Sequence, residues 1–138
     1  MHRRFDHENL KVYQMGVTFC GWRTPLLEGI ATRVAAKDQL DRASTSIVLN
    51  IAEGNGKRSY RDRSRYFDIA RGSGVESAAC LDVLVARGVV EVSEAKRGKE
   101  QLFEIVSMIG GLLARFAGDG RVEEEQAEYG IDKEKVKE

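Results

Sequence analysis

The chemistry-bearing side chains of this sequence gather between residues 57 and 71. Six cations in that stretch, Lys57, Arg58, Arg61, Arg63, Arg65 and Arg71, face two acids, Asp62 and Asp68. A local excess of positive charge attracts polyanions such as nucleic acids. A solvated helix surface that binds no ligand would carry the same charges, and the sequence leaves both interpretations open.

A second polar set accompanies these cations. Arg42, Asn50 and Glu53 lie on one side of a predicted helix, and Arg71 and Glu76 lie on the next. Arg and Glu on neighbouring helices form charge-assisted hydrogen bonds that fix helix register or a subunit contact. We therefore predict a structural or interface role for the motif residues Asn50, Glu53, Gly54, Gly72, Ser73, Gly74 and Glu76. The competing hypothesis is an RNA site in which Arg42 joins the six cations of residues 57–71.

An enzyme would need a nucleophile with a base, a perturbed acid pair or a metal site. The two histidines, His2 and His7, lie at the N-terminal edge, and Ser73 has no histidine in its sequence context. Residues 54–59 lack the spacing of a phosphate-binding loop and follow no strand. We expect a protein that is not an enzyme, with no catalytic residue, metal, cofactor or small-molecule substrate.

Length and composition indicate a single all-α domain. The chain has 138 residues, 42% of them hydrophobic, and its only proline is Pro25. A domain of this size buries enough surface to need no covalent crosslinks. Cys20 and Cys80 are sixty positions apart, so we predict buried thiols rather than a disulfide or a zinc site. The sequence shows no signal peptide and no apolar run long enough to span a membrane, which predicts a cytoplasmic protein.

The formal net charge of zero conceals an uneven distribution. Residues 119–138 hold eight acids against four bases, which leaves 18 bases against 14 acids in residues 1–118. Segments rich in charge and poor in apolar residues bury too little surface to join a core. We predict a helical domain over 1–118 and a charged, acidic tail over 119–138, either mobile or a solvated helix.

Four helical patterns follow one another along the chain. The first starts after Asp6 and places Leu10, Tyr13, Val17 and Cys20 at helical spacing. Pro25 either starts a new helix after Thr24 or kinks one helix that reaches about residue 32. The other helices are predicted over 36–54, over 60–87 with Ser59 as N-cap, and from a Ser93 N-cap to the glycines at 118 and 120.

Glycines mark the predicted helix ends and one close contact. Residues 54–56, Gly-Asn-Gly, are predicted to stop the second helix in a left-handed conformation, and Gly88 is predicted to end the third. Gly72 and Gly74 lie within the third helix, where glycine costs about 1 kcal/mol relative to alanine. Close approach of another helix is therefore predicted there.

Each of the last three helices has one inward stripe. Residues 40, 43, 44, 47, 51 and 54 fall within one 100° arc of the second helix. On the third, residues 66, 67, 70, 74, 78, 81, 84 and 85 form the stripe, and on the fourth, residues 102, 105, 106, 109, 112, 113 and 116 do. Outside these stripes lie Leu49, Ile69, Val83, Phe103 and Met108. An apolar patch built from several of them predicts self-association.

Three segments carry a resemblance to a known family. Residues 39–54, QLDRASTSIVLNIAEG, and residues 69–76, IARGSGVE, resemble two motifs of the four-helix bundle proteins encoded in intervening sequences of bacterial large-ribosomal-subunit RNA genes. Residues 9–14, NLKVYQ, resemble the opening of that family. The chain departs from the family pattern at residues 41–43, where Asp-Arg-Ala stands in place of the usual Arg-Arg-Ala.

The resemblance implies an antiparallel up-down-up-down four-helix bundle that assembles as a ring-shaped homo-pentamer. It also implies kinship with accessory proteins of diversity-generating retroelements, in which a basic surface is implicated in binding nucleic acid and a reverse transcriptase. We expect a non-catalytic oligomeric scaffold whose partners are copies of itself and RNA or an RNA-associated protein. The alternative is a protein-only interaction module whose charged motifs are structural, and a metabolic enzyme ranks third.

Overall fold

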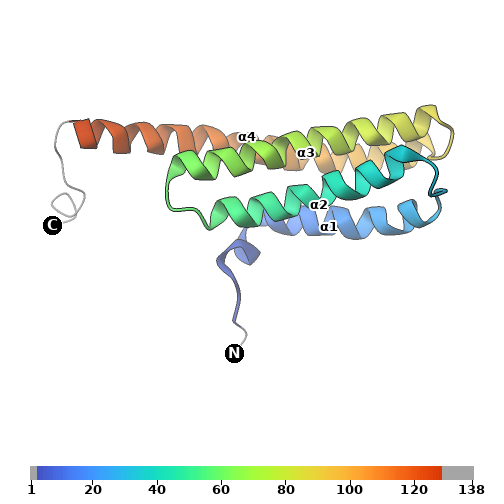
Figure 1. Ribbon diagram of the computed structural model, residues 1–138, viewed down its shortest axis with the longest axis horizontal. Helices are drawn as coiled ribbons and strands as arrows, with labels where there is room; N and C mark the ends of the chain where they lie inside the picture. The colour runs from blue at the N-terminus through green and yellow to red at the C-terminus, as the bar shows by residue number, and fades with distance from the viewer. Residues whose placement is uncertain (1–2, 129–138) are drawn as a thin grey trace.

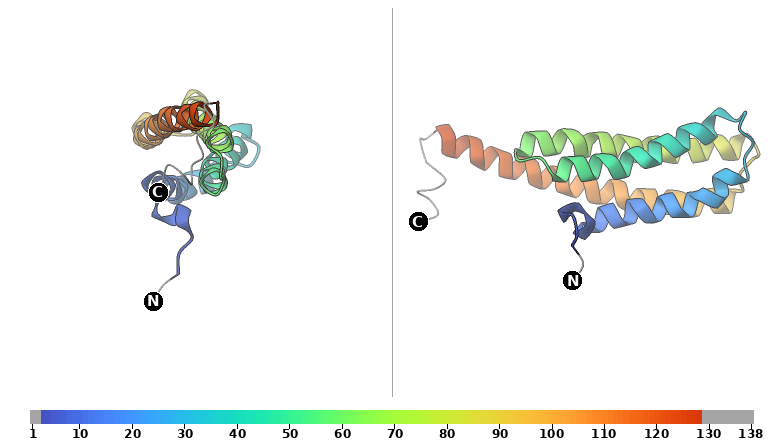
Figure 2. Two further views of the ribbon diagram at one scale, coloured as in Figure 1. Left: turned by 90° about the vertical axis from the view of Figure 1, so that its left-hand side faces the viewer. Right: turned by 60° about the horizontal axis from the view of Figure 1, so that its bottom comes forward.

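In the computed structural model, which describes residues 3–128, four helices form an antiparallel up-down-up-down bundle (Figure 1). A short 3-10 helix, Asp6–Asn9, leads into α1 (Lys11–Glu28), α2 (Ala35–Asn55), α3 (Tyr60–Ala86) and α4 (Val92–Glu128). The expected all-α bundle is confirmed. In the two views of Figure 2, α3 lies beside both α2 and α4, and α1 closes the bundle against α2 and α4.

Helix α1 runs through Pro25 and ends at Glu28. The proline therefore does not start a new helix, and the helix that contains it stops four residues before the predicted end at residue 32. Proline lacks the N–H that would bond the carbonyl four residues earlier. Pro25 lies in the last turn of α1, so the hydrogen bond that it removes is close to the end of the helix. The carbonyl groups of that last turn have no intrahelical partner whichever residue stands at position 25.

The inward face of α1 differs from the predicted one. Its buried residues are Val12, Gly16, Phe19, Arg23 and Leu27, whereas Val17 of the predicted stripe is 46% exposed. The predicted face is therefore rotated by about one residue, or 100°. Both faces of α1 carry apolar residues. The true inward face also contains Gly16 and Arg23, so its apolar pattern is interrupted and the sequence did not identify it.

The inward stripes of the next three helices agree with the prediction at their centres, although Tyr66 of the α3 stripe is only half-buried. Leu40, Ile47 and Ile51 of α2 are fully buried, and so are Leu81 and Leu84 of α3. Leu102, Ile105 and Ile109 of α4 complete the centre of the core. Periodic apolar residues identify these faces because a helix repeats every 3.6 residues.

The ends of α2 and α3 use different chemistry. Gly56 caps α2 at φ −81°, and among residues 3–128 Gly88 alone has a positive φ, +73°. The predicted left-handed stop at residues 54–56 is therefore wrong. At the end of α3, Val89 N–H donates to Leu84 O and Gly88 N–H donates to Val85 O, the paired bonds of a Schellman motif. Gly88 ends α3 as predicted.

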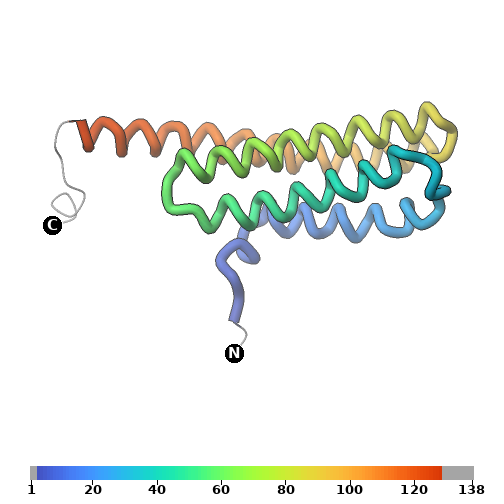
Figure 3. Tube along the Cα trace, viewed as in Figure 1, coloured from blue at the N-terminus to red at the C-terminus, as the bar shows by residue number. Residues whose placement is uncertain are grey.

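Helix α4 begins and ends beyond its predicted limits. It starts at Val92, so Ser93 lies inside the helix and is not its N-cap. It continues without interruption across the predicted domain boundary at residue 118 as far as Glu128. Its last turns project beyond the α2–α3 turn, as the trace in Figure 3 shows. The part of the acidic tail in residues 119–128 is thus a helix, and residues 129–138 lie outside the described part.

Helix α4 also contains an apolar stretch that the sequence analysis did not recognise when it predicted no run long enough to span a membrane. Among the described helices it alone is long and apolar enough to cross a membrane by length and composition, although only 17% of its most apolar stretch is buried. One such helix is weak evidence for a membrane span because core helices pass the same test. Its inward stripe belongs to the core of the bundle.

Candidate nucleic-acid interface

The basic turn, defined as residues 57–66, joins α2 to α3. Ser59 is the N-cap of α3, and its Oγ accepts a hydrogen bond from the Asp62 N–H at 3.1 Å, as predicted. Arg63 Nε donates to the Lys57 carbonyl oxygen at 2.8 Å. These bonds fasten the turn to the first turns of α3 and hold the backbone that carries the cations.

Two tyrosines stand among these cations. Lys57 Nζ lies 5.1 Å from the centroid of the Tyr66 ring, and Arg65 Cζ lies 5.2 Å from it. Arg63 Cζ lies 5.4 Å from the Tyr60 centroid. Cations at such distances from an aromatic face are attracted by the ring quadrupole. The basic turn therefore combines positive charge with aromatic rings, the combination that single-strand-binding grooves use.

The structure brings together five of the seven predicted RNA-contacting cations. Lys57, Arg58, Arg61, Arg63 and Arg65 all lie on the basic turn. Arg71 lies ten residues beyond Arg61 on α3, roughly 15 Å along the helix. Arg42 is fifteen residues before Lys57, roughly 22 Å away, and forms an exposed ion pair with Asp38 at 3.1 Å. Arg42 is therefore not part of this cluster.

Ion pairing within the basic turn is limited. Lys57 Nζ lies 3.1 Å from Glu53 Oε1, and this hydrogen bond and charge, with smaller contributions from Tyr66 and Asp62, raise the pKa of the ammonium. Lys57 is therefore charged at neutral pH. Arg58 and Arg61 are exposed and form no ion pair within residues 3–128.

The end of α4 lies against the same turn. Phe116 packs edge to face on Phe67, with centroids 5.2 Å apart, and also contacts the Tyr60 ring. Beyond it, an open groove of about 390 Å³ runs between the start of α3 and the end of α4, and its lining includes Arg61, Glu123 and Glu124. The acidic end of α4 is thus adjacent to the basic turn.

The predicted Arg–Glu bridges between helices are absent from the described residues. Glu53 pairs within its own segment with Lys57, and neither Arg71 nor Glu76 forms an ion pair in residues 3–128. Small polar groups join α2 to α3 instead. Ser46 Oγ and Ser73 Oγ lie 2.8 Å apart, and Asn50 Nδ2 donates to the Ser46 carbonyl oxygen at 2.8 Å. Ser73 therefore contributes to the contact between α2 and α3, and Asn50 bonds within α2.

The motif glycines divide into two kinds. A β-carbon on Gly74 would lie 2.7 Å from Val106 Cγ2, and one on Gly54 would lie 2.8 Å from the Phe67 ring. Both positions are close contacts between helices, as predicted for Gly74. Gly72 has nothing within 4 Å of such a β-carbon, so the predicted close approach there is wrong.

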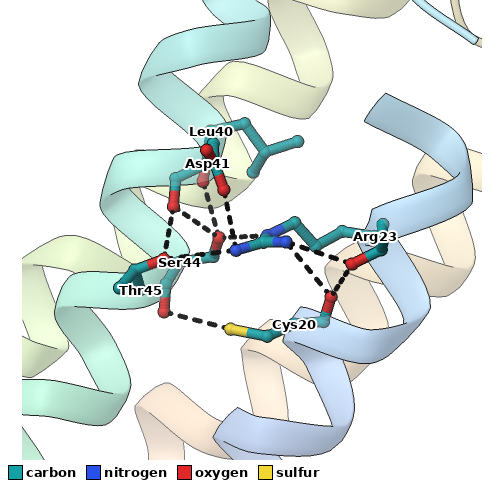
Figure 4. A network of polar contacts seen from close by, with 7 residues as sticks. Cys20, Arg23, Leu40, Asp41, Ser44 and Thr45 are labelled. Carbon is teal, nitrogen blue, oxygen red and sulfur yellow. Dashed lines mark hydrogen bonds and ion pairs between the residues drawn. The ribbon is translucent and has the colours of Figure 1, made fainter. Parts of the chain in front are cut away.

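An unpredicted polar network joins α1 to α2 (Figure 4). Arg23, a buried residue, donates from Nε to Ser44 Oγ at 2.6 Å, and its Nη2 lies 2.9 Å from Asp41 Oδ1. Further bonds reach Thr45 Oγ1, Thr24 Oγ1 and the Cys20 carbonyl oxygen. The sequence feature that could have predicted this network is an arginine, Arg23, at a core-facing position of α1. Asp41, which departs from the family pattern, is one of its anchors.

The two cysteines are free thiols, Cys80 buried and Cys20 half-buried. Burial raises the pKa of both thiols, so they are protonated at neutral pH. In the described part of the chain, no three His, Cys, Asp or Glu side chains are grouped as ligands for a metal ion.

Comparison with known proteins supplies the family. No curated protein matches the sequence. A crystal structure of a protein of unknown function from the S23 ribosomal protein family of Bacteroides thetaiotaomicron VPI-5482 has the same fold, with a TM-score of 0.69 at 19% identity. The match covers 74% of this chain and 97% of that one. The model of the 23S rRNA-intervening sequence protein family matches residues 8–111, which cover α1, α2, α3 and the part of α4 up to residue 111, and the chain belongs to this family.

Proposed function

We propose that this protein is a non-catalytic homo-oligomeric scaffold that binds RNA through its basic turn. The observation that carries the proposal is the cluster of five cations between α2 and α3, of which Arg58 and Arg61 are exposed and lack ion pairs in residues 3–128. Lys and Arg without acidic partners neutralise phosphates and release counterions. The same cations would also bind an acidic surface of an RNA-associated protein.

Exposed apolar residues on α2 and α3 support self-association. Leu49 is 62% exposed and Ile69 is 47% exposed. Leu49 follows Ser46 by one turn, and Ile69 precedes its partner Ser73 by one turn, so in the antiparallel pair both apolar residues lie on the same side of this contact, toward the α2–α3 turn. Gly72 adds no side chain to this surface. We call these three residues the α2–α3 patch, and a second copy would bury it.

Not every predicted interface residue contributes. Val83 and Phe103 are exposed, whereas Met108 is half-buried and packs against the core, so its predicted place in an outer apolar face is wrong. The weak burial of α4 gives a second reason to expect contact with another chain. A pentameric ring and the relation to retroelement accessory proteins are proposals from the resemblance, and a cytoplasmic location is a proposal from the sequence.

Salt-dependent RNA binding tests the proposal. A fluorescein-labelled 20-nucleotide RNA is titrated with the full chain between about 50 and 200 mM salt, and binding should weaken by a logarithmic slope of about −0.7 per contacted phosphate. The double variant Arg58→Glu, Arg61→Glu should lower affinity and flatten that slope.

The matched control for this test is Arg33→Glu, Arg87→Glu. It changes the net charge equally but lies at the other end of the bundle, where both arginines are exposed. Equal losses in both double variants would show attraction by overall charge only. No RNA binding by the wild-type chain at about 50 mM salt would exclude RNA and favour the protein-only interaction module.

A further inference from the structure

Tyr66 occupies a special position on the basic turn. Its ring is half-exposed and has two cationic groups over it, from Lys57 and Arg65. Its Cβ lies against α2, 2.9 Å from where a β-carbon on Gly54 would stand. The stem of the side chain is therefore fixed on the bundle, while the cations that reach the ring come from the loop before α3 and from the second turn of that helix.

Tyr60, the other tyrosine of the turn, is placed differently. Its ring contacts the buried Phe116 ring with centroids 6.1 Å apart, and its β-carbon lies 3.6 Å from the β-carbon position of Gly120. Tyr60 packs against the core and α4. Arg63 also reaches the Tyr60 ring, but that ring is shared with Phe116, whereas the ring contacts of Tyr66 within residues 3–128 are the cations of Lys57 and Arg65.

A ring with cations beside it suits one part of a nucleotide in particular. Unpaired bases stack on aromatic side chains and on arginine planes, and their phosphates require nearby positive charge. A base in a duplex is covered by its stacked neighbours, so it cannot use such a ring without being extruded. A phosphate-binding surface with no stacking residue would hold single and double strands through charge only.

We propose that Tyr66, with Lys57 and Arg65, forms a stacking site for one unpaired base, so that the basic turn prefers single-stranded RNA to duplex RNA. This inference rests on the proposed function of the turn. A base on the Tyr66 ring takes the place of one cation, and the displaced cation then lies beside the phosphate of that nucleotide. Stacking adds affinity that salt screens little, in contrast to the contribution of Arg58 and Arg61.

The test compares single-stranded and duplex RNA of equal length on the full chain. Tyr66→Leu should weaken single-strand binding about 5- to 100-fold, the range expected for loss of one stacked base. It should leave duplex binding and the salt slope unchanged. Tyr66→Phe should retain wild-type binding because the ring remains. Phe103→Leu is the matched control, since it removes an aromatic ring that is 73% exposed on α4.

Each outcome decides a different claim. A wild-type preference for the single strand that Tyr66→Leu abolishes supports the inference, and circular dichroism checks that the variant is folded. Equal wild-type affinity for both RNAs overturns the inference without requiring any variant, and leaves RNA binding intact. Unchanged single-strand affinity of Tyr66→Leu also overturns it. If the wild-type chain binds neither RNA, the proposed function and the inference both fail.

Discussion

The indole ring of Trp22 lies directly over Gly98, so that a β-carbon on this glycine would stand 2.6 Å from Trp22 Cη2. The Leu81 Cδ1 atom would be 2.9 Å from the same β-carbon. Helices α1, α3 and α4 therefore meet at a single residue that has no side chain. This contact fixes how closely α1 can approach the remainder of the bundle.

Replacing Gly98 with alanine should destabilise the fold. Overpacking a tight site costs about 1–3 kcal/mol, because the indole ring and Leu81 must both move. Gly72→Ala is the matched control, since it brings the same helix-propensity gain of about 1 kcal/mol at a site with nothing within 4 Å. Urea unfolding followed by circular dichroism should show a lower midpoint for Gly98→Ala and a higher one for Gly72→Ala. Equal midpoints would show that the indole ring relaxes freely.

Sequence periodicity predicted the fold well but not its contacts. The stripes of α2, α3 and α4, the Ser59 cap and the Gly88 stop all depend on neighbours within about five positions, which sequence patterns report directly. The meeting of Trp22 with Gly98 joins residues 76 positions apart, and no local pattern encodes it. For the same reason, sequence did not separate Gly72, which is open, from Gly74, which is tight.

The candidate site was predicted only in part. The cations of the basic turn lie within nine positions of one another in sequence, so their grouping follows from the chain itself. Arg42 was grouped with them because of its charge and its place in the polar set of the second helix, although about 22 Å of helix separates Arg42 from Lys57. The position of the acidic end of α4 beside Arg61 depends on α4 continuing past residue 118, which the glycines at 118 and 120 argued against.

The Arg23 network makes a prediction about side-chain chemistry. Arg23→Lys should lower the free energy of unfolding by about 1–2 kcal/mol, because a single ammonium cannot serve Ser44, Asp41 and the Cys20 carbonyl together. Arg42→Lys is the control, since its exposed pair with Asp38 should change stability by less than about 0.5 kcal/mol. Chemical denaturation of both variants measures the difference. If the two lose equal stability, the buried network contributes no more than a surface pair.

Self-association predicts a specific effect at Gly72. Gly72→Arg should leave the monomer fold intact, because nothing lies within 4 Å of the new β-carbon. It should lower the molar mass in solution, because a second copy seated on Leu49 and Ile69 would meet the added guanidinium. Size-exclusion chromatography with light scattering measures the mass at micromolar concentration. Glu28→Arg, at the exposed end of α1, should leave the mass unchanged.

Two results would contradict this prediction. A wild-type mass of one chain, about 15.4 kDa, would exclude self-association. A multiple of that mass that Gly72→Arg does not change would place the subunit contact elsewhere, with the weakly buried α4 as the next surface to test.

The acidic end of the chain should oppose RNA binding. Residues 121–138 contain seven acids and four bases, and the helical part of this segment extends past the basic turn, where Glu124 and Arg61 line one groove. Its negative charge lowers the local potential that attracts phosphates. Deleting residues 121–138 should therefore strengthen RNA binding. The gain should be largest at about 50 mM salt, because the Debye length there, roughly 10–15 Å, lets the charges of the α4 end act on the basic turn.

The triple variant Glu124→Gln, Glu125→Gln, Glu128→Gln separates the effect of charge from that of steric obstruction, since it keeps the helix and removes three negative charges. An increase in affinity in both variants that shrinks at about 200 mM salt is the expected result. Stronger binding only after deletion would identify steric obstruction, and unchanged binding in both would show that the end of α4 does not influence the basic turn.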